Sequence, residues 1–159
     1  MSPLGEEDHS HDAVVVRDLR PEDLDWVVAI DRQSSGEARV EYFRLKLREA
    51  RDDTGLRISL AAIVEGVPCG FVMGRLYYGE FGAPEQAAIL DSIGVSTHQR
   101  GHGVAAALIA QLRTNLAGLG IDRIETQVSW DQFELLAFFR SQGFRPSDRL
   151  CLELPLGRR

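Results

Sequence analysis

The chain is organised around the stretch Val95-Ser-Thr-His-Gln-Arg-Gly-His-Gly-Val-Ala105, in which an apolar run leads into a polar loop and then into a helical pattern. The free N–H groups of a first helical turn converge, and the helix dipole favours negative charge there, so such a joint can hold an anion. Gly101 and Gly103 lack a Cβ atom and let a phosphate approach the backbone closely. An ordinary strand-to-helix turn would use the same glycines for their conformation, so the loop alone leaves both interpretations open.

Strand and helix patterns extend from this loop in both directions. Alternating or continuous apolar runs predict strands at 13–17, 57–64, 68–77, 87–95, 121–130 and 149–154. Helical spacing predicts helices at 21–32, 37–51, 103–117 and 131–142. The order β-α-α-β-β-β-α-β-α-β combines an antiparallel hairpin around Glu65-Gly66 with two later strand-helix-strand units. We therefore expect an α/β fold (α+β by some schemes), with a mixed sheet covered by helices on both faces.

Length and charge limit the possible organisation and partners. A chain of 159 residues suits one domain. Residues 1–12 hold four acidic side chains and no Lys or Arg, so most of the net charge of −6 belongs to this tail, which we expect to be disordered. We expect residues 13–159 to form the single domain. An acidic pI near 5.2 argues against a nucleic-acid partner, which would need a basic face.

Hydropathy and cysteine content bear on location. No run reaches the roughly 18–20 apolar residues that span a bilayer, and the first residues lack the pattern of a signal peptide. Cys69 and Cys151 are too few for a disulfide framework and have no C-x-x-C partner. We expect free thiols, a cytoplasmic location, no membrane association and no metal site.

Two cofactor signatures overlap in the loop. Gly101-x-Gly103-x-x-Ala106 formally satisfies the dinucleotide fingerprint, but five residues separate its first glycine from the strand end at Val95, and little chain follows to complete a nucleotide-binding half. A P-loop is excluded because no Gly-Lys-Ser/Thr follows. The alternative is Arg100-x-x-Gly103-x-Ala105 after a strand that ends in Ile93-Gly94-Val95.

This second pattern resembles the acyl-CoA signature of the GNAT superfamily of N-acetyltransferases, Arg/Gln-x-x-Gly-x-Gly/Ala. The segment Trp130–Phe144 is similar to the family's strand end, helix and Gly-Phe, and the resemblance covers about residues 13–154. It implies the family's fold, with a mostly antiparallel central sheet, and acyl-CoA as cosubstrate.

The resemblance also assigns roles to residues of this sequence. The backbone of Ile93, Gly94 and Val95 should run beside the pantetheine arm, and the Val95 N–H should donate to the thioester carbonyl oxygen as charge develops. The pyrophosphate should lie on the amides of Arg100, Gly101, His102, Gly103, Val104 and Ala105. Gln132 and Phe139 occupy positions where the family usually has Asn and Tyr, and they are expected near the cofactor.

Two chemical roles stay open at this stage. Asp91, the only acid in 87–95, is the candidate for removing a proton from the attacking amine. An equally weighted interpretation is a polar residue at a bulge that pairs locally or faces solvent. Phe139 has no proton for the departing thiolate. Solvent, the amine's own proton, Tyr77 or Tyr78 would have to supply it, or catalysis would be weak or absent.

The leading hypothesis is an acetyl-CoA-dependent N-acetyltransferase that acts on a primary amine of a small molecule or a protein by direct attack in a ternary complex. The alternative is a non-catalytic acyl-CoA-binding or regulatory module on the same fold, and a nicotinamide-dependent enzyme is a distant third. The sequence leaves open the acceptor, whether the acyl group is strictly acetyl, and the oligomeric state. Because dimers are common in the family, a homodimer is one expectation.

Overall fold

A computed structural model of the chain describes residues 13–52, 58–79, 81–82 and 84–157. It divides into two compact units, Met1–Gln127 and Val128–Arg159. The acidic tail predicted at 1–12 and the start of the strand predicted at 57 lie outside the described residues. The single-domain boundaries stay a prediction.

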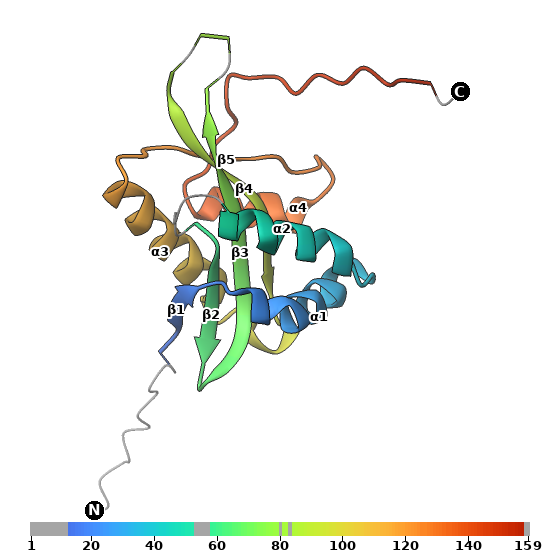
Figure 1. Ribbon diagram of the computed structural model, residues 1–159, viewed down its shortest axis with the longest axis vertical. Helices are drawn as coiled ribbons and strands as arrows, with labels where there is room; N and C mark the ends of the chain where they lie inside the picture. The colour runs from blue at the N-terminus through green and yellow to red at the C-terminus, as the bar shows by residue number, and fades with distance from the viewer. Residues whose placement is uncertain (1–12, 53–57, 80, 83, 158–159) are drawn as a thin grey trace, which may run out of the picture. The chain divides into compact units, whose positions relative to one another are not determined.

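The first unit contains a five-stranded sheet in the order β1-β2-β3-β4-β5 (Figure 1). The strands are β1 (Val15–Asp18), β2 (Leu60–Val64), β3 (Val67–Tyr78), β4 (Gln86–Val95) and β5 (Ile124–Thr126). The first three neighbouring pairs are antiparallel, and only β4 and β5 run parallel. The predicted mixed, mostly antiparallel sheet is therefore confirmed.

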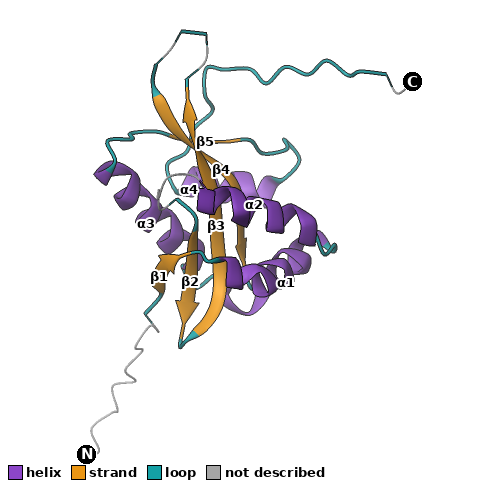
Figure 2. Cartoon of the chain, in the orientation of Figure 1, coloured by secondary structure: helices purple, strands orange, loops and turns teal. Residues whose placement is uncertain are grey.

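Four α-helices complete the described fold, namely α1 (Leu24–Ser35), α2 (Val40–Asp52), α3 (Val104–Gly118) and, in the second unit, α4 (Phe133–Ser141) (Figure 2). Two 3-10 turns, η1 (Pro21–Asp23) and η2 (Thr97–Gln99), precede α1 and α3. Proline suits the first position of η1, because the N–H that proline lacks would have no hydrogen-bond partner within the helix there. Gly36 ends α1 with φ of 77°, a left-handed conformation that favours glycine.

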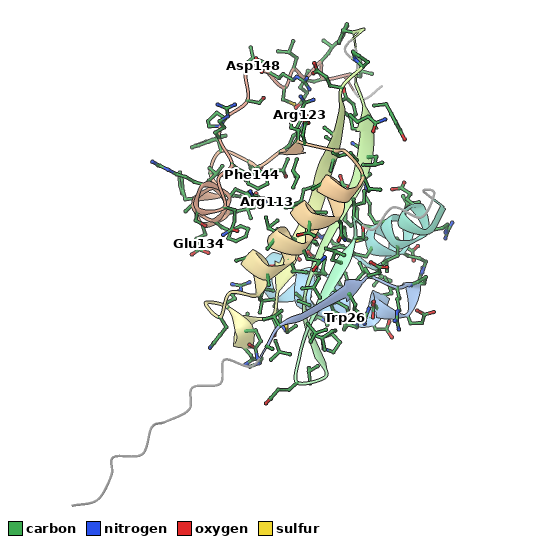
Figure 3. The ribbon with its side chains drawn as sticks, turned by 90° about the vertical axis from the view of Figure 1, so that its left-hand side faces the viewer. Trp26, Arg113, Arg123, Glu134, Phe144 and Asp148 are labelled. Carbon is green, nitrogen blue, oxygen red and sulfur yellow. The ribbon has the colours of Figure 1, made fainter. Side chains whose placement is uncertain are left out.

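Two glycines show that α1 and α3 cover opposite faces of the sheet. Gly94 of β4 pairs with Phe71 of β3, and a Cβ at Gly94 would lie 3.2 Å from Ile30 of α1. The adjacent pair is Gly70 and Val95, and a Cβ at Gly70 would lie 2.8 Å from Val104 of α3. Since adjacent residues of a strand point to opposite faces, the two helices lie on different sides of the sheet, as the side view shows (Figure 3).

Each face has its own apolar packing. On the side of α1 and α2, the Phe71 ring meets the rings of Trp26 and Phe43 edge-on, with centroids 6.4 and 5.6 Å apart. The same cluster contains Val27, Val28, Ile30, Leu47 and Met73. On α3 the buried residues include an i, i+4 row of four: Val104, Leu108, Leu112 and Leu116.

The later strands differ from the sequence prediction. β5 has three residues rather than eight or more, and no strand forms over 149–154, so the final strand of the predicted order is wrong in this structure. Leu150, Leu152 and Leu154 alternate as predicted, but the described segment is extended chain outside the sheet. A strand needs a neighbouring strand whose backbone N–H and C=O groups it can pair with. The alternation of leucines and polar residues indicates which face of a strand would be apolar, but it does not provide that neighbour.

Among the described residues no helix is long and apolar enough to cross a membrane.

Candidate functional site

The second half of β4 has a strand neighbour on one side only. β3 pairs along it as far as Gly70 and Val95, whereas β5 pairs only with Ala88, Ile89 and Leu90. From Asp91 onward the described residues place no strand on the β5 side. The pairing of the two parallel strands therefore ends in the middle of β4.

The hydrogen-bond pattern shows which peptide groups face this open side. The Ser96 N–H donates to the Cys69 carbonyl at 2.8 Å, so the Cys69–Ser96 pair is hydrogen-bonded. Hydrogen-bonded and non-hydrogen-bonded pairs alternate along an antiparallel ladder. The peptide groups of Val95, and by the same alternation those of Ile93, therefore point away from β3. These are the groups that an extended ligand lying beside β4 would meet.

The glycine loop continues directly from this edge. The N–H of Thr97 donates to the side-chain oxygen of Gln33 at 2.8 Å, which ties the start of the loop to α1. Gly101 and Gly103 have φ of 80° and 78°, a region that disfavours residues with a Cβ. The α3 helical bonds begin with the Ala107 N–H donating to the Gly103 carbonyl at 3.0 Å.

The first amides of α3 precede this bond and have no helical carbonyl to bind. Arg100, Gly101, His102 and Gly103 are exposed, so the loop is accessible to a ligand. Val104 is buried beneath it and Ala105 is half-buried, which fixes the loop on the α3 core. The predicted loop residues thus lie together beside the open edge of β4.

Asp91 lies at a β-bulge. The register with β3 pairs Met73 with Ser92 but Gly74 with Leu90, so Asp91 is the extra residue on β4. Its carboxylate has two cationic neighbours, with Lys46 Nζ 3.2 Å from Oδ2 and Arg75 Nε 3.7 Å from Oδ1. The structure therefore shows the locally paired arrangement, and the role of Asp91 as base stays a prediction.

Sequence reasoning missed Lys46, the only lysine of the chain. Burial would lower the pKa of the Lys46 ammonium, but its hydrogen bond to Asp91 and the charges of Asp91 and Glu49 outweigh that effect and raise the pKa above its ordinary value. One helical turn earlier, the Tyr42 hydroxyl lies 3.2 Å from the Ser92 hydroxyl. The i, i+4 spacing of Tyr42 and Lys46 places both on one face of α2, but no local signal links that face to β4.

The remaining predicted site residues lie in the second unit. Gln132 is exposed and caps the N-terminus of α4, where its carbonyl accepts the Leu136 N–H at 3.0 Å. Phe139 is 4% exposed and packs between Phe138 and Phe144, with ring centroids 5.4 and 4.8 Å away. Phe139 is therefore part of the apolar packing of its own unit.

The two tyrosines proposed as alternative acids lie at the far end of the β3–β4 ladder. Tyr77 pairs with Ala87 and Tyr78 with Gln86, whereas Val95 lies opposite Gly70. Val95 is nine positions after Gln86, and at about 3.3 Å per residue this is roughly 30 Å of strand. The structure does not bring Tyr77 or Tyr78 to the open end of β4.

The sequence matches the model of the acetyltransferase (GNAT) family over residues 20–144. No curated protein sequence matches the chain. Among solved structures, the chain is similar to the aminoglycoside N-acetyltransferase AAC(6')-Iy in complex with CoA, with a TM-score of 0.72 and 17% identity over 98% of this chain and 99% of that one.

Two further solved structures have the same fold, with similar TM-scores and similarly low sequence identities. One is a ribosomal-protein-alanine N-acetyltransferase from Brucella melitensis biovar Abortus 2308, with a TM-score of 0.70 and 20% identity over 91% of this chain and 100% of that one. The other is a transcriptional regulator from Bacillus halodurans C-125, with a TM-score of 0.72 and 14% identity over 91% and 100%. At these identities the likeness shows the fold alone.

Proposed function

The chain belongs to the acetyltransferase (GNAT) family, and on that premise we propose that it transfers an acetyl group from acetyl-CoA to a primary amine of a small molecule or a protein. The observation that carries this proposal is the open edge of β4, where the peptide groups of Ile93 and Val95 point away from β3 beside the glycine loop. An extended pantetheine arm and an adjacent pyrophosphate require those two features together. The relatives with known acceptors include enzymes for aminoglycosides and for a ribosomal protein, which supports an amine without selecting one.

In this proposal the chain binds acetyl-CoA mainly through its backbone. The amides from Arg100 to Ala105 hold the pyrophosphate, since convergent N–H groups and the helix dipole favour an anion there. Ile93 and Val95 pair with the pantetheine amides as an added strand would. The Val95 N–H polarises the thioester carbonyl and stabilises the negative charge on its oxygen during attack.

The reaction moves the acetyl group in one attack. The neutral amine nitrogen bonds to the carbonyl carbon, the carbon–sulfur bond breaks, and the thiolate leaves with the electron pair. The proton lost by the amine goes to Asp91 through a water molecule. Because Lys46 and Arg75 lie beside the two carboxylate oxygens, accepting that proton requires one ion pair to loosen. Solvent then protonates the thiolate, because Phe139 carries no proton to give, and Asp91 returns the proton it accepted to solvent.

The second candidate function is a non-catalytic acyl-CoA-binding or regulatory module. It is favoured by Phe139, whose ring is buried among Phe138 and Phe144 and offers no hydroxyl. It also fits the likeness to a structure named as a transcriptional regulator. This module would bind acyl-CoA through the same backbone groups of β4 and the glycine loop, and it would not need Asp91 as a base.

Ligand-dependent melting tests acyl-CoA binding, which both candidates share. We expect acetyl-CoA, but not NADH, to raise the melting temperature in proportion to its concentration, because a ligand that binds only the folded state stabilises it by mass action. Stabilisation by NADH alone would exclude both candidates in favour of a nicotinamide enzyme. Thiol release across polyamines, aminoglycosides, amino acids and peptides then separates the enzyme from the module.

A further inference from the structure

The two cationic neighbours of Asp91 hold its carboxylate in different ways. Lys46 Nζ donates a hydrogen bond to Oδ2 at 3.2 Å. Arg75 Nε lies 3.7 Å from Oδ1, which is beyond hydrogen-bond distance. The Lys46 side chain is 20% exposed and the Arg75 side chain 50%. Lys46 is therefore the close partner of Asp91, and Arg75 is a loose one that water can reach.

The guanidinium of Arg75 also differs from that of Arg39, which donates two hydrogen bonds to the Asp31 carboxylate at 2.8 and 2.5 Å. Among the described residues, no acceptor takes a hydrogen bond from the Arg75 side chain. A guanidinium carries five N–H donors in a planar fork that matches the two oxygens of a carboxylate. Arg75 therefore has donors to offer a ligand beside the candidate base.

The Arg75 side chain lies on the sheet face that α1 and α2 cover. Met73, two residues earlier on β3, belongs to the apolar cluster under these helices, and residues two apart on a strand share a face. Arg75 pairs with Ile89, and Asp91 follows on β4 as the bulge residue. Because β5 stops pairing at Leu90, this guanidinium lies where the open edge of β4 begins.

The proposed reaction limits how far the reacting amine can be from Arg75. A single water molecule between the amine and the Asp91 carboxylate spans two hydrogen bonds, or about 5.6 Å. Since Arg75 Nε is 3.7 Å from that carboxylate, an anion bonded to Arg75 lies at most about 12 Å from the amine nitrogen. The amine and the anion therefore belong to one small unit, of the size of an amino acid.

On the premise of the proposed acetyl transfer, we propose that the acceptor carries a carboxylate within a few bonds of its reacting amine, as an amino acid does, and that Arg75 binds this carboxylate. The Arg75 fork turns from Asp91 to the acceptor, while Lys46 stays on Oδ2. This turn loosens one of the two ion pairs of Asp91, which is what Asp91 needs in order to accept the proton of the amine.

The acids around this site offer little to a polycationic acceptor such as an aminoglycoside. Four carboxylates of α1, α2 and β4 are already ion-paired with an arginine or with Lys46: Asp31, Glu41, Glu49 and Asp91. A polycation also brings no carboxylate, so it would neither occupy Arg75 nor loosen its pair with Asp91. The local charges therefore favour an acceptor with one amine and one carboxylate.

Matched pairs of acceptors test the role of the carboxylate. Thiol release from acetyl-CoA is measured with each free amino acid and with its carboxamide. We expect kcat/KM to be about ten- to hundredfold higher for the free amino acid, because a hydrogen-bonded ion pair is lost with the carboxamide. Capping the carboxylate also lowers the pKa of the amine and leaves more of it neutral, so protonation of the amine does not account for a slower carboxamide. Peptides that begin with aspartate or with asparagine form a second pair, which tells a peptide N-terminus from a free amino acid as the source of the carboxylate.

Substitutions at Arg75 test the residue. Arg75→Gln should raise KM for the free amino acid and reduce its preference over the carboxamide to about one, while the carboxamide reacts at least as fast as with the wild type because Oδ1 of Asp91 has lost its cation. Arg75→Lys keeps the charge without the fork and should restore part of the preference. Arg44→Gln is the matched control, since the Arg44 side chain is 47% exposed on α2 and should leave the preference unchanged.

A binding measurement separates this proposal from the proposed activity. With CoA present and no acetyl group to transfer, calorimetry should show that the free amino acid binds the wild type and the Arg44→Gln chain, and binds Arg75→Gln at least tenfold more weakly. An absence of turnover with every amine would contradict the acetyl transfer, and this measurement would still decide the role of Arg75.

Three results would overturn the proposal. The first is equal use of the free amino acids and their carboxamides, and the second is a preference for polyamines or aminoglycosides over amino acids. The third is a preference or a binding affinity for the amino acid that is the same in Arg75→Gln as in the wild type.

Discussion

Replacing Asp23 by Asn removes one negative charge from a buried carboxylate at the start of the first helix. Asp23 is 5% exposed, and its carboxylate accepts two hydrogen bonds from the Arg17 guanidinium at 2.7 and 2.8 Å. It also accepts the Arg20 backbone N–H at 2.7 Å and the Trp26 indole N–H at 2.8 Å. These bonds join β1 to the start of α1, so the change acts on the anchor of the first helix.

The expected cost follows from this geometry. Breaking a buried ion pair by removing one partner costs about 3–5 kcal/mol, since the other charge is left without a partner. The Arg17 side chain is 28% exposed, so water can solvate part of the guanidinium, and we expect a loss near the lower end. A loss of about 3 kcal/mol corresponds to a drop in melting temperature of roughly 6–12 °C for a chain of this size.

The stability that Asp23 contributes should decrease in acid. Burial alone would raise the pKa of Asp23, but the hydrogen bonds from Arg17, Trp26 and the Arg20 amide outweigh it and hold the pKa below the ordinary 3.8. The stabilisation is therefore fully present well above pH 3.8 and is lost as the pH falls through the lower pKa of the folded state. The difference in unfolding free energy between wild type and Asp23→Asn should be constant at neutral pH and shrink in acid.

Urea unfolding of both proteins at several pH values measures this difference. Asp25→Asn is the control, because Asp25 is exposed in the next turn and should change stability little. A neutral-pH difference under about 1 kcal/mol, which is typical of an exposed pair, would refute the reasoning. So would a difference that persists unchanged in acid.

Four further substitutions address the candidate site. Gly101→Ala should lower the free energy of unfolding by about 1–2 kcal/mol, because φ is 80° at this position. It should also weaken acetyl-CoA binding measured by calorimetry. Unchanged binding would show that the glycine loop does not hold the cofactor. Gly94→Ala should lower the free energy of unfolding in urea by about 1–3 kcal/mol, since its Cβ would lie 2.7 Å from a Phe71 ring carbon. An unchanged free energy of unfolding would mean that the packing around Phe71 relaxes freely. Asp91→Asn should slow amine-dependent thiol release and spare acetyl-CoA binding. Lys46→Met keeps the Asp91 carboxylate and should retain turnover. Equal losses of rate in the two variants would assign the effect to the ion pair between Lys46 and Asp91.

The parts of the site that are contiguous in sequence could be predicted. The joint of β4, glycine loop and α3 is local, since the apolar strand, the left-handed glycines and the buried row of α3 each follow from their own residues. The open edge beside Val95 does not follow from the local sequence. It depends on β5 ending at Thr126, and nothing in 121–130 marks that end.

Long-range contacts account for what the sequence did not reveal. Lys46 and Asp91 are 45 positions apart, and their pairing depends on how α2 crosses β4 and on the bulge that turns Asp91 out of register. The strand predicted at 149–154 failed for a related reason. Its alternation describes one face of a strand, while the partner that would complete the ladder has to come from another part of the sheet or from another chain.

The central claim is that this chain transfers an acetyl group to an amine, and thiol release from acetyl-CoA tests it most directly. With a panel of polyamines, aminoglycosides, amino acids and peptides, we predict that at least one amine releases free CoA thiol faster than solvent hydrolysis. We also predict that the Asp91→Asn chain loses most of this rate while it still binds acetyl-CoA. Release no faster than hydrolysis with every amine, from a chain that acetyl-CoA stabilises, would contradict the enzyme and leave the acyl-CoA-binding module.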